Sequence, residues 1–100
     1  MIISRAPVRI SMGGGGTDLP SYYEKFGGFL LAASINRYVH ILLNKRFEES
    51  IRLSYSETEI VNKISEIKHS IFKASLQYSG IKKQIEIVSI ADVPSNCGLG

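Results

Sequence analysis

The last nine residues of the 100-residue chain combine the residue types that bind an anion through the backbone. They read Asp-Val-Pro-Ser-Asn-Cys-Gly-Leu-Gly, from Asp92 to Gly100. Pro94 has no N–H to donate to a neighbouring strand, so it is expected to end one. Asn96, Gly98 and Gly100 readily adopt positive φ. A strand that runs into such a loop presents consecutive N–H groups to a phosphate. The run therefore predicts half of a phosphate loop, with a plain turn as the alternative.

A second glycine-rich run lies near the N-terminus, where residues 13–20 read Gly-Gly-Gly-Gly-Thr-Asp-Leu-Pro. Ordering consecutive glycines costs much backbone entropy. A folded protein is expected to keep them where a ligand approaches the backbone or where φ must be positive, and a flexible hinge is the alternative. Asp18 is also a candidate N-cap for a helix that begins at Pro20. The cap and a ligand-binding role are compatible.

These two loops need strands and helices to hold them. Five runs share the alternation and the β-branched or aromatic residues that predict strands: 2–12, 29–35, 38–45, 51–55 and 84–91. Pro7 would lie at an edge or in a bulge. Only Asn36-Arg37 separates the second run from the third, which form either a hairpin or one long bent strand. A short helix is predicted over 20–25, and Gly27-Gly28 predicts a turn.

A longer helix, of about twenty residues, is predicted between the last two strands because apolar residues recur there at three- and four-residue steps. Its stripe, interpreted as core-facing, contains Ile60, Ile64, Ile67, Ile71, Ala74 and Tyr78. Thr58 or Ser56 would be the N-cap, with Glu59 in the first turn. Ser79-Gly80 supplies the C-terminal stop. Strands followed by one helix and a strand predict an α+β two-layer domain.

Composition narrows the classes of function. The chain is 44% hydrophobic, enough for one domain, and its net charge is +3 with a pI of about 9.1. The basic residues are scattered, which argues against a dedicated nucleic-acid binder. Cys97 is the single cysteine, so no internal disulfide is expected. The first twelve residues lack a signal-peptide pattern and no apolar run is long enough to span a bilayer, so we expect a cytoplasmic protein.

His40 is interpreted as a structural strand residue and His69 as a solvated surface residue.

The two glycine runs and their flanks resemble the motifs of the GHMP small-molecule kinase superfamily. The first motif reads Ala6-Pro7-Val8-Arg9-Ile10-Ser11, followed by the glycines and Thr17-Asp18. The second matches Pro94 to Gly100 and breaks off before the two serines that usually continue it. In this form the first motif is most similar to the D-glycero-D-manno-heptose 7-phosphate kinase branch, with fucokinase-like sugar kinases next.

The resemblance implies a fold and an activity. The fold would be α+β, like ribosomal protein S5 domain 2, with mostly antiparallel strands and one long helix. Residues 1–100 would be the N-terminal part of the ATP-binding domain of a GHMP kinase, truncated inside the phosphate loop. The full-length protein would transfer a phosphoryl group from ATP to the C1 hydroxyl of D-glycero-D-manno-heptose 7-phosphate. The catalytic aspartate and the Mg²⁺ ligands would lie beyond residue 100, so we expect these residues alone to be inactive.

The resemblance also implies roles for individual residues. Arg9 would be catalytic, stabilising charge on the transferred group or lowering the pKa of the acceptor hydroxyl. Four residues would bind the sugar: Gly15, Gly16, Thr17 and Asp18. Six would bind ATP: Pro94, Asn96, Cys97, Gly98, Leu99 and Gly100. No metal ligand is expected among residues 1–100, and the expected partners are a sugar phosphate and ATP rather than nucleic acid or membrane.

Other functions stay open. The chain could come from a fucokinase- or galactokinase-like enzyme, from a kinase-like sensor, or from a non-catalytic S5-like module that binds sugar or nucleic acid. A nucleic-acid module is expected to carry basic and aromatic residues in its loops, and residues 13–16 and 95–100 contain neither.

Overall fold

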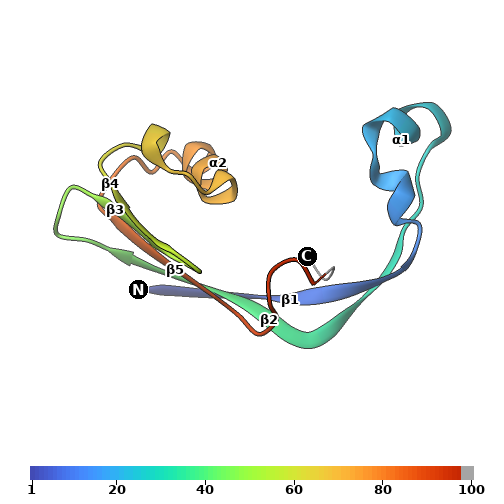
Figure 1. Ribbon diagram of the computed structural model, residues 1–100, viewed down its shortest axis with the longest axis horizontal. Helices are drawn as coiled ribbons and strands as arrows, with labels where there is room; N and C mark the ends of the chain where they lie inside the picture. The colour runs from blue at the N-terminus through green and yellow to red at the C-terminus, as the bar shows by residue number, and fades with distance from the viewer. Residues whose placement is uncertain (98–100) are drawn as a thin grey trace. The chain divides into compact units, whose positions relative to one another are not determined.

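A computed structural model of the chain describes residues 1–97, in which strands β1 to β5 form one sheet accompanied by two α-helices (Figure 1). Strand order in the sheet is β1-β2-β5-β3-β4. The strands are β1 Ile2–Gly13, β2 Leu31–Lys45, β3 Ile51–Ser54, β4 Thr58–Val61 and β5 Ile85–Ala91. The helices are α1 Pro20–Phe26, α2 Ser70–Ser79 and the short 3-10 helices η1 Gly15–Asp18 and η2 Ile64–Glu66. None of the helices among the described residues has the length and apolarity that a membrane crossing requires.

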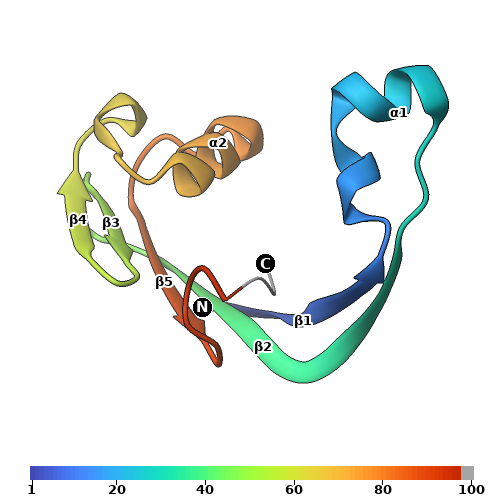
Figure 2. The ribbon, with the colours of Figure 1, turned by 45° about the vertical axis from the view of Figure 1, so that its right-hand side comes forward.

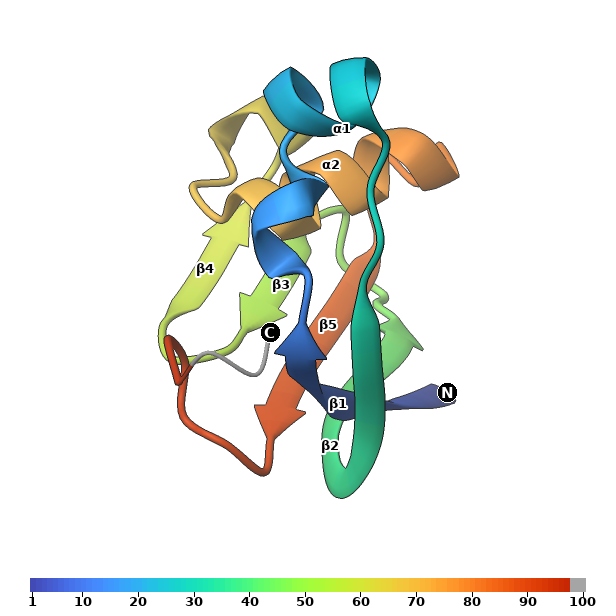
Figure 3. The same ribbon diagram turned by 90° about the vertical axis from the view of Figure 1, so that its right-hand side faces the viewer.

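The chain divides into two compact units. The core unit consists of Met1–Arg5 and His40–Ile90, and the loop unit consists of Ala6–Val39 and the residues from Ala91 onward. Strands β1 and β2 each contribute residues to both. In the core unit α2 lies over the strands β3 and β5 (Figures 1 and 3). In the loop unit β1 leads into η1 and α1, and β2 returns beside β1 (Figure 2).

The apolar core lies in the core unit. Strands β3 and β5 are parallel and pair Ile51 with Ile85 and Leu53 with Ile87. Side chains alternate between the faces of a strand, so these four residues share one face. Ile67 and the α2 residues Phe72 and Leu76 are buried in the same cluster. The hydrophobic effect therefore selects alternate residues of the two strands and one face of α2.

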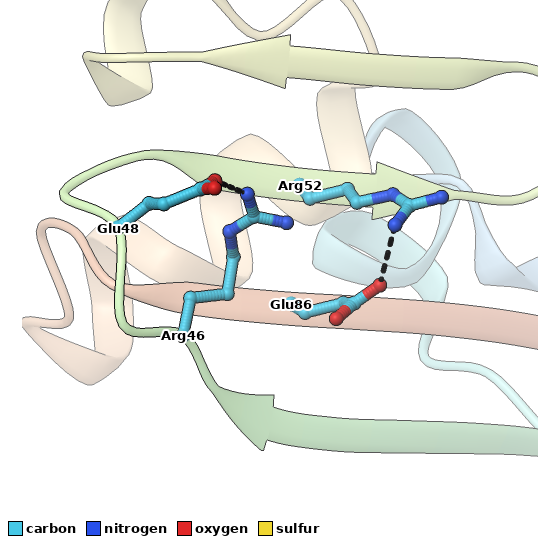
Figure 4. A network of polar contacts seen from close by, with 4 residues as sticks. All are labelled: Arg46, Glu48, Arg52 and Glu86. Carbon is cyan, nitrogen blue, oxygen red and sulfur yellow. Dashed lines mark hydrogen bonds and ion pairs between the residues drawn. The ribbon is translucent and has the colours of Figure 1, made fainter.

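The opposite face of the same strands is polar. Arg52 and Glu86 are register partners on β3 and β5, and the Arg52 Nη1 atom lies 3.2 Å from the Glu86 Oε1 atom (Figure 4). Arg46 and Glu48 form a second ion pair in the turn after β2 (Figure 4). Partly exposed pairs of this kind contribute about 0.2–1 kcal/mol each. The alternation of apolar and charged residues thus determines which face α2 covers.

The structure confirms the α+β class and corrects two details. The sheet is mixed, because β3 runs parallel to β5 and antiparallel to β4. The long helix predicted from about residue 58 is wrong in its first half. Thr58–Val61 is strand β4, paired with β3, and the helix α2 has only ten residues.

The predicted apolar stripe is also not the buried face of the helix. The prediction is confirmed for Ile67, which precedes the helix and is 3% exposed, but Ile60, Ile71 and Tyr78 are 64%, 69% and 97% exposed. The buried residues of α2 are Phe72 and Leu76. In β4 the side chain of Glu59 is buried instead of supporting a first helical turn. β-branched residues such as Thr58 and Ile60 favour strands, and pairing with β3 outweighs a spacing that also suits a helix.

Other local predictions are confirmed. Residues 2–12 and 84–91 contain strands, Pro20 begins α1, and Gly80 ends α2 with a φ of 73°. Pro7 lies in β1, which is an edge strand. Residues 29–35 and 38–45 were predicted to form either a hairpin or one long bent strand. The structure has one strand there, because β2 runs without a break through Asn36-Arg37.

His40 is half-buried in β2, in line with a structural role. His69 is not simply solvated. It is half-buried before α2, and its ring centroid lies 4.6 Å from that of Tyr55 and 4.7 Å from that of Phe72.

Candidate functional site

The hydroxyl of Thr17 closes the first glycine run. Its Oγ1 atom donates to the Gly14 carbonyl at 2.7 Å and accepts a hydrogen bond from the Phe29 N–H at 3.1 Å. The Thr17 N–H also donates to the Gly14 carbonyl, at 3.0 Å. These bonds connect both ends of the segment that contains η1 and α1. The Thr17 side chain therefore holds the loop together, and its role in sugar binding stays a prediction.

Gly14 is the position in this run that needs glycine. Its φ is 88°, and a Cβ atom there would lie 2.0 Å from the Phe29 carbonyl oxygen. A Cβ added to Gly15 would meet only the Ser11 Oγ atom, at 3.9 Å, and one added to Gly16 would meet nothing within 4 Å. The backbone of the two predicted sugar-binding glycines is thus open, whereas Gly14 lets the loop approach Phe29.

Asp18 is the last residue of η1 and is exposed. It does not cap α1, because Leu19 precedes the helix and no side-chain hydrogen bond caps its first turn. The predicted cap is wrong, since the 3-10 turn places Asp18 one residue too early. Its carboxylate stays accessible to a ligand. Sugar hydroxyls suit a carboxylate, which offers several acceptor sites.

Arg9 lies in β1 next to Val8, the one residue of this strand that is buried. Neighbouring side chains of a strand point to opposite faces. The exposed Arg9 side chain therefore projects from the face opposite to Val8. The strand offers a fixed backbone for a guanidinium group at this position.

The second predicted loop starts at an anchored residue. The Asp92 N–H donates to the Tyr38 carbonyl at 2.9 Å, and the Tyr38 N–H donates to the Asp92 Oδ2 atom at 2.8 Å. This reciprocal pair joins the residue after β5 to β2 and fixes where the loop leaves the sheet. No role was predicted for Asp92 from the sequence, because its partner Tyr38 is 54 residues away along the chain.

The described part of this loop is exposed. Asn96 has a φ of 62°, the left-handed conformation that its residue type predicts. Pro94 and Cys97 are exposed, and Cys97 is a free thiol. The other predicted ATP-binding residues, Gly98, Leu99 and Gly100, lie outside the described residues.

All predicted site residues that the structure describes belong to the loop unit. The hydrogen bonds of the first loop join residues 14, 17 and 29, and those of the second join Tyr38 and Asp92. The pocket lined by Leu43 and Ile85 and the pocket lined by Asn62 and Gln77 both lie in the core unit, and neither is lined by a predicted site residue. Within residues 1–97 no group of three or more His, Cys, Asp or Glu side chains is placed to hold a metal ion.

Solved structures of two kinases share this fold. A D-glycero-D-manno-heptose 1-phosphate kinase from B. thetaiotaomicron superposes with a TM-score of 0.78 and 22% identity, covering 97% of this chain and 36% of that chain. The Methanococcus jannaschii mevalonate kinase superposes with a TM-score of 0.67 and 20% identity, covering 98% of this chain and 34% of that chain. The chain therefore has the fold of the N-terminal part of a GHMP kinase domain.

One curated protein is similar in sequence along nearly the whole chain. The D-glycero-alpha-D-manno-heptose 7-phosphate kinase of Campylobacter jejuni is 34% identical over 113 aligned positions, which cover 99% of this chain and 33% of that protein. The match confirms the resemblance to the GHMP kinases and to their heptose 7-phosphate kinase branch. The chain spans about a third of the length of this curated relative. No family model matches the chain.

Proposed function

We propose that the protein with this sequence is an ATP-dependent sugar kinase that phosphorylates D-glycero-D-manno-heptose 7-phosphate at the C1 hydroxyl. The observation that carries the proposal is the 34% identity to a kinase of that name over 99% of the chain. Both motif loops support it, because each begins at the end of a strand and the first leaves a carboxylate and two open glycines accessible.

The first loop would hold the sugar. The Asp18 carboxylate can accept hydrogen bonds from two neighbouring hydroxyls. Gly15 and Gly16 have no side chain to keep the sugar ring from the backbone. Thr17 acts by keeping the loop closed on Phe29, so that Asp18 is presented from a fixed turn.

Arg9 and the second loop would act on phosphate. ATP supplies the phosphoryl group, and the Arg9 guanidinium stabilises the negative charge on its oxygens during transfer. The backbone N–H groups of the segment from Pro94, including Asn96 and Cys97, would hold the nucleotide phosphates. Gly98, Leu99 and Gly100 would continue this segment. We propose that the ligands of Mg²⁺ and the catalytic aspartate are residues outside this sequence.

Residues 1–100 would form the N-terminal part of the ATP-binding domain, and we propose that they have no kinase turnover alone. They cover a third of the kinase relative, and the proposed site requires residues that they do not contain. The working compartment proposed for the enzyme is the cytoplasm.

The test measures ADP release by the protein expressed from the complete reading frame. Heptose 7-phosphate is compared with galactose, fucose and mevalonate, and ³¹P NMR locates the new phosphate. We expect heptose 7-phosphate to be preferred at least about 100-fold in kcat/KM, in line with the cost of leaving site polar groups unpaired. Preference for galactose or fucose would support the alternative sugar kinases, and no ADP release with any acceptor would support a binding module.

Two variants test the residue roles. Arg9→Ala is expected to lower kcat by about 100-fold or more, the usual loss when a donor to transition-state charge is removed. Asp18→Asn is expected to raise KM for the sugar with a smaller change in KM for ATP. Lys25→Gln, at an exposed lysine in the last turn of α1, serves as the control. Unchanged kinetics in both test variants would contradict the assignments.

A further inference from the structure

A pocket of about 510 Å³ in the core unit combines positive charge with neutral hydrogen-bond donors. It lies between the segment after β4, the last turns of α2 and the turn before β5. Its polar lining residues are Asn62, Lys63, Ser65, Gln77, Lys82 and Lys83. The volume is within the range of small-molecule sites.

The lysines of this pocket are only partly neutralised. Lys83 donates to the Glu49 Oε1 atom at 2.7 Å. Neither Lys63 nor Lys82 has an ion-pair partner among residues 1–97. Two side-chain ammonium groups from separate segments thus remain available at one pocket. An anion bound at the pocket would relieve the repulsion between the like charges that line it.

The other charged side chains beside the pocket leave its net charge positive. The Glu66 Oε2 atom accepts a hydrogen bond from the Asn62 N–H at 3.2 Å, which places one carboxylate beside the pocket. The Lys73 Nζ atom donates to the Ser65 carbonyl at 3.2 Å, which places another ammonium group there. Glu66 and Lys73 offset each other, and Glu49 offsets Lys83. The charges of Lys63 and Lys82 remain.

We propose that this pocket binds a small anion that carries at least two phosphate groups. The two ammonium groups would contact phosphate oxygens, because charge-assisted hydrogen bonds to phosphate are the stronger ones. The hydroxyl of Ser65 and the amides of Asn62 and Gln77 supply further donors. The site consists of core-unit residues and does not rest on the proposed kinase function, whose residues belong to the loop unit.

The test is a titration of the ¹⁵N-labelled chain with inorganic pyrophosphate at constant ionic strength, followed by amide chemical shifts. We expect saturable shifts at residues 62–65, 77 and 82–83, and weaker binding of orthophosphate. The double variant Lys63→Gln/Lys82→Gln is expected to bind pyrophosphate about tenfold more weakly, as expected for losing two partly screened charge contacts. Lys25→Gln, in the loop unit, is the matched control and is expected to bind like the parent chain.

Several results would overturn the proposal. Shifts confined to residues 95–97 would assign pyrophosphate to the second loop instead. An equal effect of sodium chloride at matched ionic strength would show charge screening without a site. Circular dichroism would show whether the double variant is folded. If it is folded and binds pyrophosphate as tightly as the parent chain, the two lysines do not contribute to binding. If orthophosphate binds as tightly as pyrophosphate, the site does not require two phosphate groups.

Discussion

The Glu59 carboxylate connects strand β4 to the start of α2. It is 8% exposed and accepts hydrogen bonds from the Tyr55 hydroxyl at 2.7 Å and from the N–H groups of Lys68 and His69 at 2.9 and 3.3 Å. The bond from the Lys68 N–H, followed by that from Tyr55, lowers the pKa of Glu59, and desolvation opposes this. The bond to Glu59, with desolvation, raises the pKa of Tyr55 to about 12. Glu59 thus accepts hydrogen bonds from the two backbone N–H groups just before α2, whose N-cap residue His69 makes no side-chain capping bond.

This arrangement predicts a pH dependence of stability. Because the folded pKa of Glu59 lies below its usual value of 4.5, the unfolded chain binds more protons over the interval between the two values. The contribution of Glu59 is complete above the usual value and is lost as the pH falls through the folded value. We expect Glu59→Gln to reduce the loss of stability below about pH 4.5, measured as the urea midpoint at a series of pH values.

The control for this prediction is Glu57→Gln, which changes an exposed carboxylate beside the network. Its acid-induced loss of stability is expected to follow that of the parent chain. A second readout is the phenol absorbance of Tyr55, whose pKa is expected to fall towards 10.0 when Glu59 is replaced. An unchanged Tyr55 titration in Glu59→Gln would contradict the network.

Gly14 gives a second prediction at the residue scale. In Gly14→Ala the new Cβ would lie 2.0 Å from the Phe29 carbonyl oxygen at a φ of 88°, so the loop must move. We expect a loss of about 2 kcal/mol or more in the free energy of unfolding, since both a clash and strained φ contribute. Gly13→Ala, which meets nothing within 4 Å, is expected to stay within about 1 kcal/mol. Equal losses in the two variants, measured by urea denaturation, would be inconsistent with this loop geometry.

At the scale of elements, α2 packs through a face other than the one that its sequence spacing suggests. Leu76 is 2% exposed and Ile71 is 69% exposed. We expect Leu76→Ala to cost about 2–5 kcal/mol, because it removes core contacts and leaves a cavity. Ile71→Ala is expected to stay within about 0.5 kcal/mol. A larger loss for Ile71→Ala than for Leu76→Ala, in the same denaturation assay, would contradict the packing of α2.

For the whole molecule, burial predicts unequal stability of the two units. Among residues 1–97 the buried apolar residues belong to the core unit, except for Val8. Local opening costs less where few apolar contacts are buried. We expect amide hydrogen exchange of the full chain to be slowest in β3 and β5 and faster in α1. Exchange in α1 as slow as in Ile51–Ser54 would show that something other than the apolar core stabilises the loop unit.

Much of the candidate site was predictable because its signals are local. Glycine and asparagine adopt the left-handed backbone conformation because of their own covalent structure. Positive φ in the loops that contain Gly14 and Asn96 could therefore be predicted without knowledge of distant contacts. The anchoring roles of Thr17 and Asp92 were not predictable, because their partners Phe29 and Tyr38 are 12 and 54 residues away.

The sequence by itself determined the strands around both glycine runs, the α+β class and the resemblance to GHMP kinases. These follow from side-chain alternation, backbone preference and motif spacing, all of which act over short distances along the chain. Only the tertiary structure decided that residues 58–61 form a strand, that Phe72 and Leu76 are the buried residues of α2, and that Glu59 supports the start of the helix. The physical reason is that pairing with β3 and burial against β3 and β5 outweigh a helical spacing of apolar residues, and neither partner is visible in the local sequence.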